Sequence, residues 1–236
     1  MIWVVGNVDG NYYKEPFSKG VLARSLRFSN LGLDQAYEIA SDIETKLIEN
    51  EVDEISLDEL SKYISDYLKK IDPDIAFKYK RLSSLRKSNE PLIILIGGAS
   101  GVGTSSMAFE LANRLGLKNI ISTDMIREVM RKIISKELNP VIHKSSFDAY
   151  ESIRTPAIRV DTTIEGFISH VDVVNVGIEA IVERSIKEGI SIIIEGVHVV
   201  PGFIREDLIN KGNIIILTLI VEDEEMHKQM FYSRCR

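Results

Sequence analysis

Hydrophobic residues recur every three or four positions through the first third of the chain. This spacing places them on one face of a helix, and it predicts a helix with core positions Ala36, Ile39, Ala40, Ile43 and Leu47. A second helix should begin at residues 56–59, because Ser56 and Glu59 have the spacing of a capping box. The apolar positions of this second helix are Leu57, Leu60, Ile64, Tyr67 and Leu68.

The residues before these helices predict a hairpin and a further helix. Three valines, at positions 4, 5 and 8, precede Asp9-Gly10, a dipeptide typical of tight hairpin turns. Ser18 is a predicted helix cap, because its hydroxyl can accept a hydrogen bond from a backbone amide of the first turn. The apolar positions of that helix are Val21, Leu22, Ser25 and Leu26.

A polar stretch at residues 81–90 separates two parts of the chain. It overlaps the end of a helix expected over residues 74–85 and precedes Pro91, which disfavours helical backbone in the residue before it. We therefore expect a small, mostly helical domain at residues 1–88 and a second domain at residues 89–236.

After residue 90, short apolar runs alternate with helical patterns. The predicted strands cover residues 92–96, 120–121, 190–194 and 214–221, and helices are expected up to Gly116 and over residues 125–135. Continuous runs of β-branched residues between helices are typical of parallel strands buried on both faces. The expected fold class is α/β, a parallel sheet with helices on both faces.

Composition narrows the class of function. The 236 residues include 29 Lys+Arg and 35 Asp+Glu, a net charge of -6, which argues against a general nucleic-acid binder. The single cysteine, Cys235, excludes a disulfide scaffold and a Cys-rich zinc site. No apolar run approaches the ~18 residues needed to span a bilayer, and the N-terminus lacks the pattern of a signal peptide. We expect a soluble cytoplasmic protein, and the sequence leaves its oligomeric state open.

The motif GGASGVGTSS at residues 97–106 stands between a predicted strand and a predicted helix. Glycines let backbone amides turn inward, and a helix N-terminus adds positive potential, so this context predicts a phosphate-binding loop. With this loop, the expected parallel sheet is of the P-loop NTPase type. The Ser105 hydroxyl stands where such a loop holds Mg²⁺. The residues expected to bind the phosphates of ATP are Gly98, Ala99, Ser100, Gly101, Val102, Gly103, Thr104, Ser105 and Ser106.

Thr104 occupies the place of the usual P-loop lysine. A cation for the β- and γ-phosphates must therefore come from elsewhere in the chain. The alternative interpretation of the motif is a tight strand-to-helix turn that binds no ligand.

The segment STDMIREVMR at residues 122–131 follows the second predicted strand. Asp124 should cap the next helix at the sheet edge where open α/β folds bind ligands. Arg127 and Arg131 are four residues apart, so they share a helix face and can bind an anionic substrate. The alternative is a capping aspartate above a solvated arginine face.

A third candidate is Glu195, which ends the buried strand that precedes Gly196-Val197-His198. A carboxylate at this place can orient Mg²⁺ or activate a nucleophile, and the alternative is a solvated strand end. His198 by itself favours a structural hydrogen bond over a catalytic role. The polar segment from His143 to Arg154 contains no clear strand and predicts a binding loop or lid, with a plain solvated loop as the alternative.

These motifs together resemble the archaeal 2-phosphoglycerate kinase family, from about Pro91 to the end of the chain. The strings that carry the resemblance are IGGASGVGTSS, STDMIREVMR, SSFDAYESIRTPA and IIIEGVHVVPG. The family also carries threonine in place of the P-loop lysine. The resemblance implies transfer of the γ-phosphoryl group of ATP to the 3-hydroxyl of 2-phosphoglycerate.

The resemblance also implies roles for particular residues. Asp124 would align or deprotonate the acceptor hydroxyl, with Glu195 as the alternative base. Arg127, Arg131 and Arg154 would bind the acceptor. The basic end of the chain resembles the start of the family's lid, whose last elements this chain is expected to lack. Its cations, which would compensate for Thr104, are Lys228, Arg234 and Arg236.

The first half of the chain is similar to an ATP-cone, a small nucleotide-binding module. The matching positions include Asp9-Gly10, residues 15–17, the helix at 36–40 and residues 54–60. Two rival functions remain open at this point: a kinase for another small acceptor, and a non-catalytic protein that senses ATP.

The N-terminal half departs from the ATP-cone pattern where the module carries cations. Asn7 and Val8 replace a Lys-Arg pair, and Val21 replaces a lysine. Because neutral side chains do not pair with phosphate, we expect a fragment of residues 1–90 to bind ATP weakly or not at all. Titration calorimetry measures this, and tight Mg²⁺-dependent binding would instead favour a regulatory role over a scaffold.

Overall fold

The computed structural model describes residues 1–8, 11–27, 29, 31–87, 90–152 and 161–233. The chain divides into two compact units, residues 1–88 and residues 89–236. No helix in the described part of the chain is long and apolar enough to cross a membrane.

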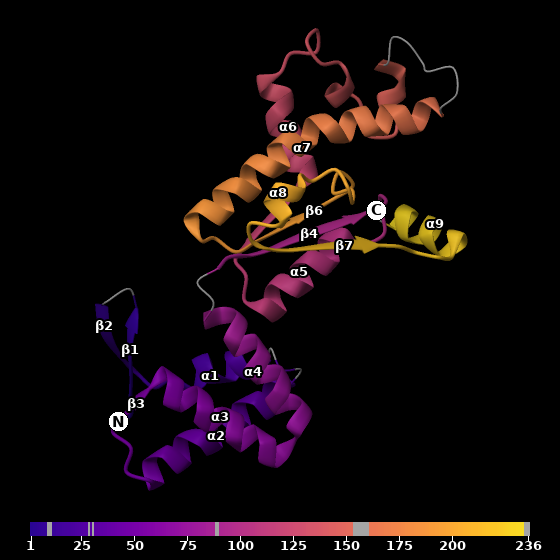
Figure 1. Cartoon of the computed structure of the whole chain (residues 1–236). Coiled ribbons are helices and arrows are strands. Elements are labelled where there is room, and N and C mark those ends of the chain that lie inside the picture. Colours follow the sequence, from indigo (N-terminus) through magenta and orange to yellow (C-terminus); the bar gives the residue numbers. More distant parts are fainter. Residues whose placement is uncertain (9–10, 28, 30, 88–89, 153–160, 234–236) are drawn as a thin grey trace. The chain divides into compact units, whose positions relative to one another are not determined.

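The described part of the first unit combines a small sheet with several helices (Figure 1). Its strands are β1 (Trp3–Val8), β2 (Asn11–Pro16) and β3 (Glu54–Ser56), in the order β2-β1-β3. The pair β1 and β2 is antiparallel, which confirms the predicted hairpin, while β3 runs parallel to β1. Its helices are α1 (Lys19–Arg27), α2 (Leu33–Glu49), α3 (Leu57–Ile71) and α4 (Pro73–Lys87).

Local sequence signals account for most of this unit. The predicted core positions of α2 are buried, and the capping box at the start of α3 is present. There the Glu59 amide donates to the Ser56 hydroxyl (3.2 Å) and the Ser56 amide donates to the Glu59 carboxylate (3.0 Å). Val21 and Leu57, which stand among the predicted apolar positions of α1 and α3, are 61% and 46% exposed. Strand β3 was not predicted, because three residues show no period.

The second unit is built on one parallel sheet. Its strands are β4 (Leu92–Gly98), β5 (Asn119–Ser122), β6 (Ile192–Glu195) and β7 (Asn213–Leu219), in the order β5-β6-β4-β7. Every neighbouring pair is parallel. The helical elements are α5 (Thr104–Leu115), α6 (Thr123–Ile133), η1 (Val141–His143), η2 (Ala149–Ser152), α7 (Thr162–Glu188), α8 (Glu206–Ile209) and α9 (Glu224–Ser233).

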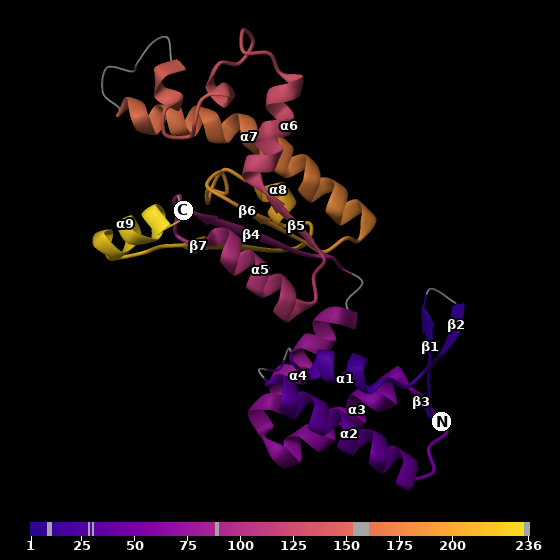
Figure 2. The same cartoon turned by 180° about the vertical axis from the view of Figure 1, so that it is seen from behind.

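Helices cover both faces of this sheet, which confirms the predicted α/β class (Figures 1 and 2). Successive residues of a strand point to opposite faces. Ile93 and Leu95 of β4 therefore pack with Val174, Ile178 and Val182 of the long helix α7. On the other face, Ile94 and Ile96 pack with two alanines of α5, Ala108 and Ala112.

The start of α6 differs from the sequence-based prediction. Ser122, not Asp124, is the helix cap, and its hydroxyl accepts from the amide of Met125 (3.2 Å). The prediction of Asp124 as the cap is therefore wrong. Because the serine already satisfies that amide, the Asp124 carboxylate lies in the first turn and pairs with Arg127 (Oδ1 to Nη2, 3.2 Å).

Two histidines are fully buried between the sheet edge, α6 and α7. The rings of His170 and His198 meet edge to face, with centroids 4.9 Å apart. Burial, together with the positive charges of Arg127 and Arg131, lowers the pKa of His170 to about 4. Burial also lowers the pKa of His198 to about 3, with His170 and the same two arginines adding to the shift. Both rings are therefore neutral at pH 7.

These buried histidines make the stability of the fold depend on pH. Below the unfolded-state pKa of 6.5, the unfolded chain binds protons that the folded chain excludes, so stability falls as the pH falls from about 6.5. Between pH 7.5 and pH 5 each histidine should cost about 2 kcal/mol of unfolding free energy.

Urea denaturation at the two pH values measures this dependence. The double variant His170→Gln/His198→Gln is the matched control and should show a much smaller difference between the two pH values. Equal wild-type stability at both pH values, or an undiminished difference in the double variant, would contradict the assignment.

Candidate active site

The phosphate-binding loop lies between the end of β4 and the first residue of α5. Gly101 (φ 89°) and Gly103 (φ 93°) adopt left-handed backbone conformations, which glycine tolerates and other residues rarely adopt. Gly103 occupies the cap position of α5, so no side-chain cap competes for the first amides of this helix. Those amides and the helix dipole together form a site suited to a phosphate group.

Glu195 joins the end of β6 to this loop. Its side chain accepts hydrogen bonds from the hydroxyls of Thr104 (2.7 Å) and Ser105 (3.0 Å), and the residue is only 5% exposed. The residue that replaces the P-loop lysine thus donates to an acid on the neighbouring strand. The contact brings three sequence-predicted residues together from positions about 90 residues apart.

A small polar pocket of about 160 Å³ opens over this contact. Its lining includes Ser105, Glu195 and Asp124, whose side chains offer only oxygen ligands. Mg²⁺ is usually held by one or two carboxylates together with phosphate and water, so this set fits Mg²⁺. Within the described ranges, no three His, Cys, Asp or Glu side chains form a complete metal cage. Phosphate oxygens would therefore have to complete the coordination.

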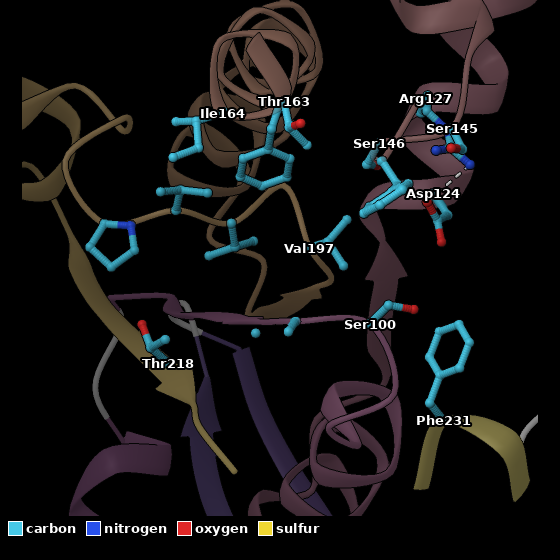
Figure 3. A pocket seen from close by; sticks show the side chains of 17 residues that line it. Ser100, Asp124, Arg127, Ser145, Ser146, Thr163, Ile164, Val197, Thr218 and Phe231 are labelled. Carbon is cyan, nitrogen blue, oxygen red and sulfur yellow. Dashed lines mark ion pairs between the residues drawn. The ribbon is translucent and has the colours of Figure 1, made fainter. Parts of the chain in front are cut away.

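A larger cavity of about 810 Å³ lies beside the small pocket. Figure 3 shows Asp124, Arg127, Ser145 and Ser146 gathered at one side of it, with Thr218 on the opposite side. Much of the remaining wall is apolar and consists of Phe147, Ile164, Phe167, Val197, Val199, Val200, Pro201 and Phe231. The polar side is the part of the cavity suited to a charged ligand.

Arg127 supplies the positive charge on that polar side. Its side chain is 17% exposed, and its Nε atom is buried without a hydrogen-bond partner among the described residues. Burial lowers the pKa of the guanidinium, which the Asp124 carboxylate opposes. Because a buried donor without a partner is costly, an anion that accepts from this group would gain binding energy.

Arg131 does not line the cavity, although the sequence placed it on the same helix face as Arg127. Its guanidinium donates to the backbone carbonyls of Ile142 and Lys144 and to the Glu128 carboxylate. These contacts hold the segment that leads into Ser145. Arg131 therefore positions this loop. The contact of Arg131 with the acceptor stays a prediction.

Helix α9, the last described element of the chain, contacts the phosphate-binding loop. The ring of His227 lies 2.9 Å from the carbonyl oxygen of Ser100, and Phe231 lies against Gly101. Lys228 is on this helix but pairs with Glu224 (3.1 Å) and Glu225 (3.0 Å), and hydrogen bonds to these two carboxylates raise its pKa. The predicted residues Arg154, Arg234 and Arg236 lie outside the described residues.

Several lining residues were not predicted individually. Ser145 and Ser146 belong to the polar segment that the sequence marked as a binding loop, and their adjacent hydroxyls were the available signal. Phe231 and His227 belong to the chain end that resembles the family's lid, but their contacts with a loop 127 or more residues away have no local pattern.

Comparison with known proteins identifies the family. A model of the ATP cone domain matches residues 8–88. The 2-phosphoglycerate kinase of Methanothermobacter thermautotrophicus is 58% identical over 237 residues, which cover 100% of this chain and 78% of the relative. The enzymes of that name from Methanopyrus kandleri and Pyrococcus horikoshii are 47% and 40% identical, covering 97% and 96% of this chain and 70% and 74% of theirs. Similarity of this extent shows that the chain belongs to the 2-phosphoglycerate kinase family.

Proposed function

We propose that this chain transfers the γ-phosphoryl group of ATP to the 3-hydroxyl of 2-phosphoglycerate, giving 2,3-bisphosphoglycerate and ADP. The observation that carries the proposal is the junction of two pockets. Ala99, Ser100, Asp124 and Val197 line both the small polar pocket over Ser105 and the larger cavity with Arg127. A phosphoryl donor in one pocket and an anionic acceptor in the other would meet at these residues.

The phosphate-binding loop would hold ATP through its backbone amides. The Ser105 hydroxyl would bind Mg²⁺, and Glu195 would hold the ion directly or through water. A bound Mg²⁺ ion would neutralise negative charge on the β- and γ-phosphates. Because Glu195 faces two loop hydroxyls, its position suits this role better than that of the base.

Asp124 is the better-placed candidate for the base. Its carboxylate is 60% exposed and belongs to the lining of both pockets. In the proposed step the 3-oxygen of the acceptor bonds to the γ-phosphorus, and the bond from that phosphorus to the bridging oxygen breaks. The bonding electrons leave with ADP, and Asp124 accepts the proton of the hydroxyl.

Arg127 would bind the phosphate or the carboxylate of the acceptor. A guanidinium presents several donors in one plane, which matches either anion. Arg154 and Arg131 are further candidates from the sequence. The cation missing at Thr104 would come from the end of the chain, through Lys228, Arg234 or Arg236. The contact of α9 with the phosphate-binding loop supports this placement.

We further propose that residues 89–236 form the kinase domain and residues 1–88 an ATP-cone domain. Each range is a compact unit with its own core.

The larger cavity, at about 810 Å³, has more room than 2-phosphoglycerate fills. The identity of the acceptor is therefore tested with a panel of small phosphorylated and carboxylated compounds, each assayed for ADP release. Faster turnover of another acceptor would replace 2-phosphoglycerate, and absence of any turnover would favour an ATP-sensing protein.

Replacing Ser105 by alanine should weaken the use of Mg·ATP. The change removes the hydroxyl that would bind the metal and leaves the backbone amides in place. We expect kcat/KM for ATP to fall by about 10-fold or more, with a shift to higher Mg²⁺ demand. Initial rates across a Mg²⁺ series measure this. Asn113→Ala, at an exposed position about two turns along α5, is the matched control. Wild-type rates at every Mg²⁺ concentration would exclude Ser105 as a ligand.

Replacing Arg127 by alanine should weaken acceptor binding selectively. Losing a partly buried charged contact costs about 2–5 kcal/mol, so the KM for 2-phosphoglycerate should rise far more than the KM for ATP. Steady-state kinetics with each substrate varied separately measure the two constants. Arg114→Ala, which removes an exposed arginine paired with Glu110 on α5, controls for the loss of one positive charge. An unchanged KM for 2-phosphoglycerate in Arg127→Ala would show that this arginine does not bind the acceptor and only pairs with Asp124.

A further inference from the structure

His198 links two elements that the proposed reaction uses separately. It lies just after β6, and its buried ring spans the gap between helix α6 and the loop that contains Ser146. Nδ1 is 2.8 Å from the hydroxyl of Thr123, and Nε2 is 3.2 Å from the hydroxyl of Ser146. Thr123 is also buried, whereas Ser146 lines the large cavity on the same side as Arg127 (Figure 3).

The ring is held in its neutral form by its surroundings. His170 packs edge-on against it from α7, and the charges of Arg127 and Arg131 act on it from α6. A neutral imidazole donates from one nitrogen and accepts at the other. Both of its partners are hydroxyls, and a hydroxyl can donate or accept, so the ring can adopt either tautomer here.

The two possible tautomers have opposite consequences for the cavity. If Nδ1 accepts from Thr123, then Nε2–H donates to the Ser146 oxygen, and the Ser146 proton is free to point toward a ligand. If Nε2 instead accepts from Ser146, the serine presents only lone pairs to the cavity. An anionic ligand beside Arg127 needs donors, so it is compatible with the first arrangement.

We propose that His198 is a positioning residue for the phosphoryl acceptor. Through its Nε2–H it holds the Ser146 oxygen and directs the Ser146 hydroxyl proton at an oxyanion of the acceptor bound next to Arg127. This inference rests on the proposed function, because it takes the ligand of the polar side to be an anionic acceptor. Arg131 anchors the same loop at Lys144, two residues before this serine, so the loop is held from both sides.

Two variants of the histidine separate this role from simple packing. The amide of His198→Gln reaches the position of Nε2 and keeps a donor for Ser146, whereas His198→Asn keeps a polar group only near Nδ1. We expect His198→Asn and Ser146→Ala each to raise the KM for 2-phosphoglycerate by about 10-fold to 100-fold, the loss expected for one hydrogen bond to a charged group. The KM for ATP should stay nearly unchanged, and His198→Gln should remain close to wild type.

The double variant His198→Asn/Ser146→Ala supplies the decisive comparison. If the histidine acts through the serine, the double variant should have no higher acceptor KM than either single variant. Thermal unfolding of each protein checks that it is folded. Since Ser146→Ala removes one hydroxyl at the cavity edge, it tests the link even if His198→Asn does not fold.

Three results would overturn the inference: an unchanged acceptor KM in Ser146→Ala, effects that multiply in the double variant, or equal impairment by the Gln and Asn substitutions. Failure of the wild-type enzyme to phosphorylate 2-phosphoglycerate would overturn the proposed function itself. That result needs no variant, so it is distinguishable from failure of the inference about His198.

Discussion

The Glu195 carboxylate ends a buried strand and accepts hydrogen bonds from Thr104 and Ser105, the two hydroxyls that begin α5. A carboxylate removed from water is costly unless donors surround it, so these bonds hold the helix N-terminus against the edge of the sheet. The position of the phosphate-binding amides relative to β6 depends on this contact. The small polar pocket exists because the contact places its oxygen ligands together.

Charge around this contact follows a consistent arrangement. The uncapped start of α5 provides positive potential, and the acids Glu195 and Asp124 line the small polar pocket beside it, where the proposed reaction would use them for Mg²⁺ and for the transferred proton. On the polar side of the larger cavity, Arg127 is the one cationic residue among the described residues that line it. Its charge also helps to keep His170 and His198 neutral, so the positive charge stays on the group that faces the cavity.

Much of the fold was predictable from local patterns. The period of the apolar residues gave α2 and α3, and the apolar runs between helices gave the strands of the parallel sheet. These signals work because burial of one helix face, or of both faces of a strand, constrains residues that are close in sequence. Where the local signal was short or ambiguous the prediction failed, as for β3 and for the cap of α6, where Ser122 stands two residues before Asp124.

The candidate site shows the same division between local and long-range information. The sequence by itself determined the glycine-rich loop between β4 and α5, the acid at the end of β6 and the arginines that follow Asp124 on α6, because each depends on residue types within one short segment. Only the tertiary structure decided that Thr104 donates to Glu195, that Arg131 anchors a loop while Arg127 lines the cavity, and that His198 reaches Ser146. Those contacts join segments between 11 and 91 residues apart, and side-chain direction at such distances is set by packing, which no local pattern encodes.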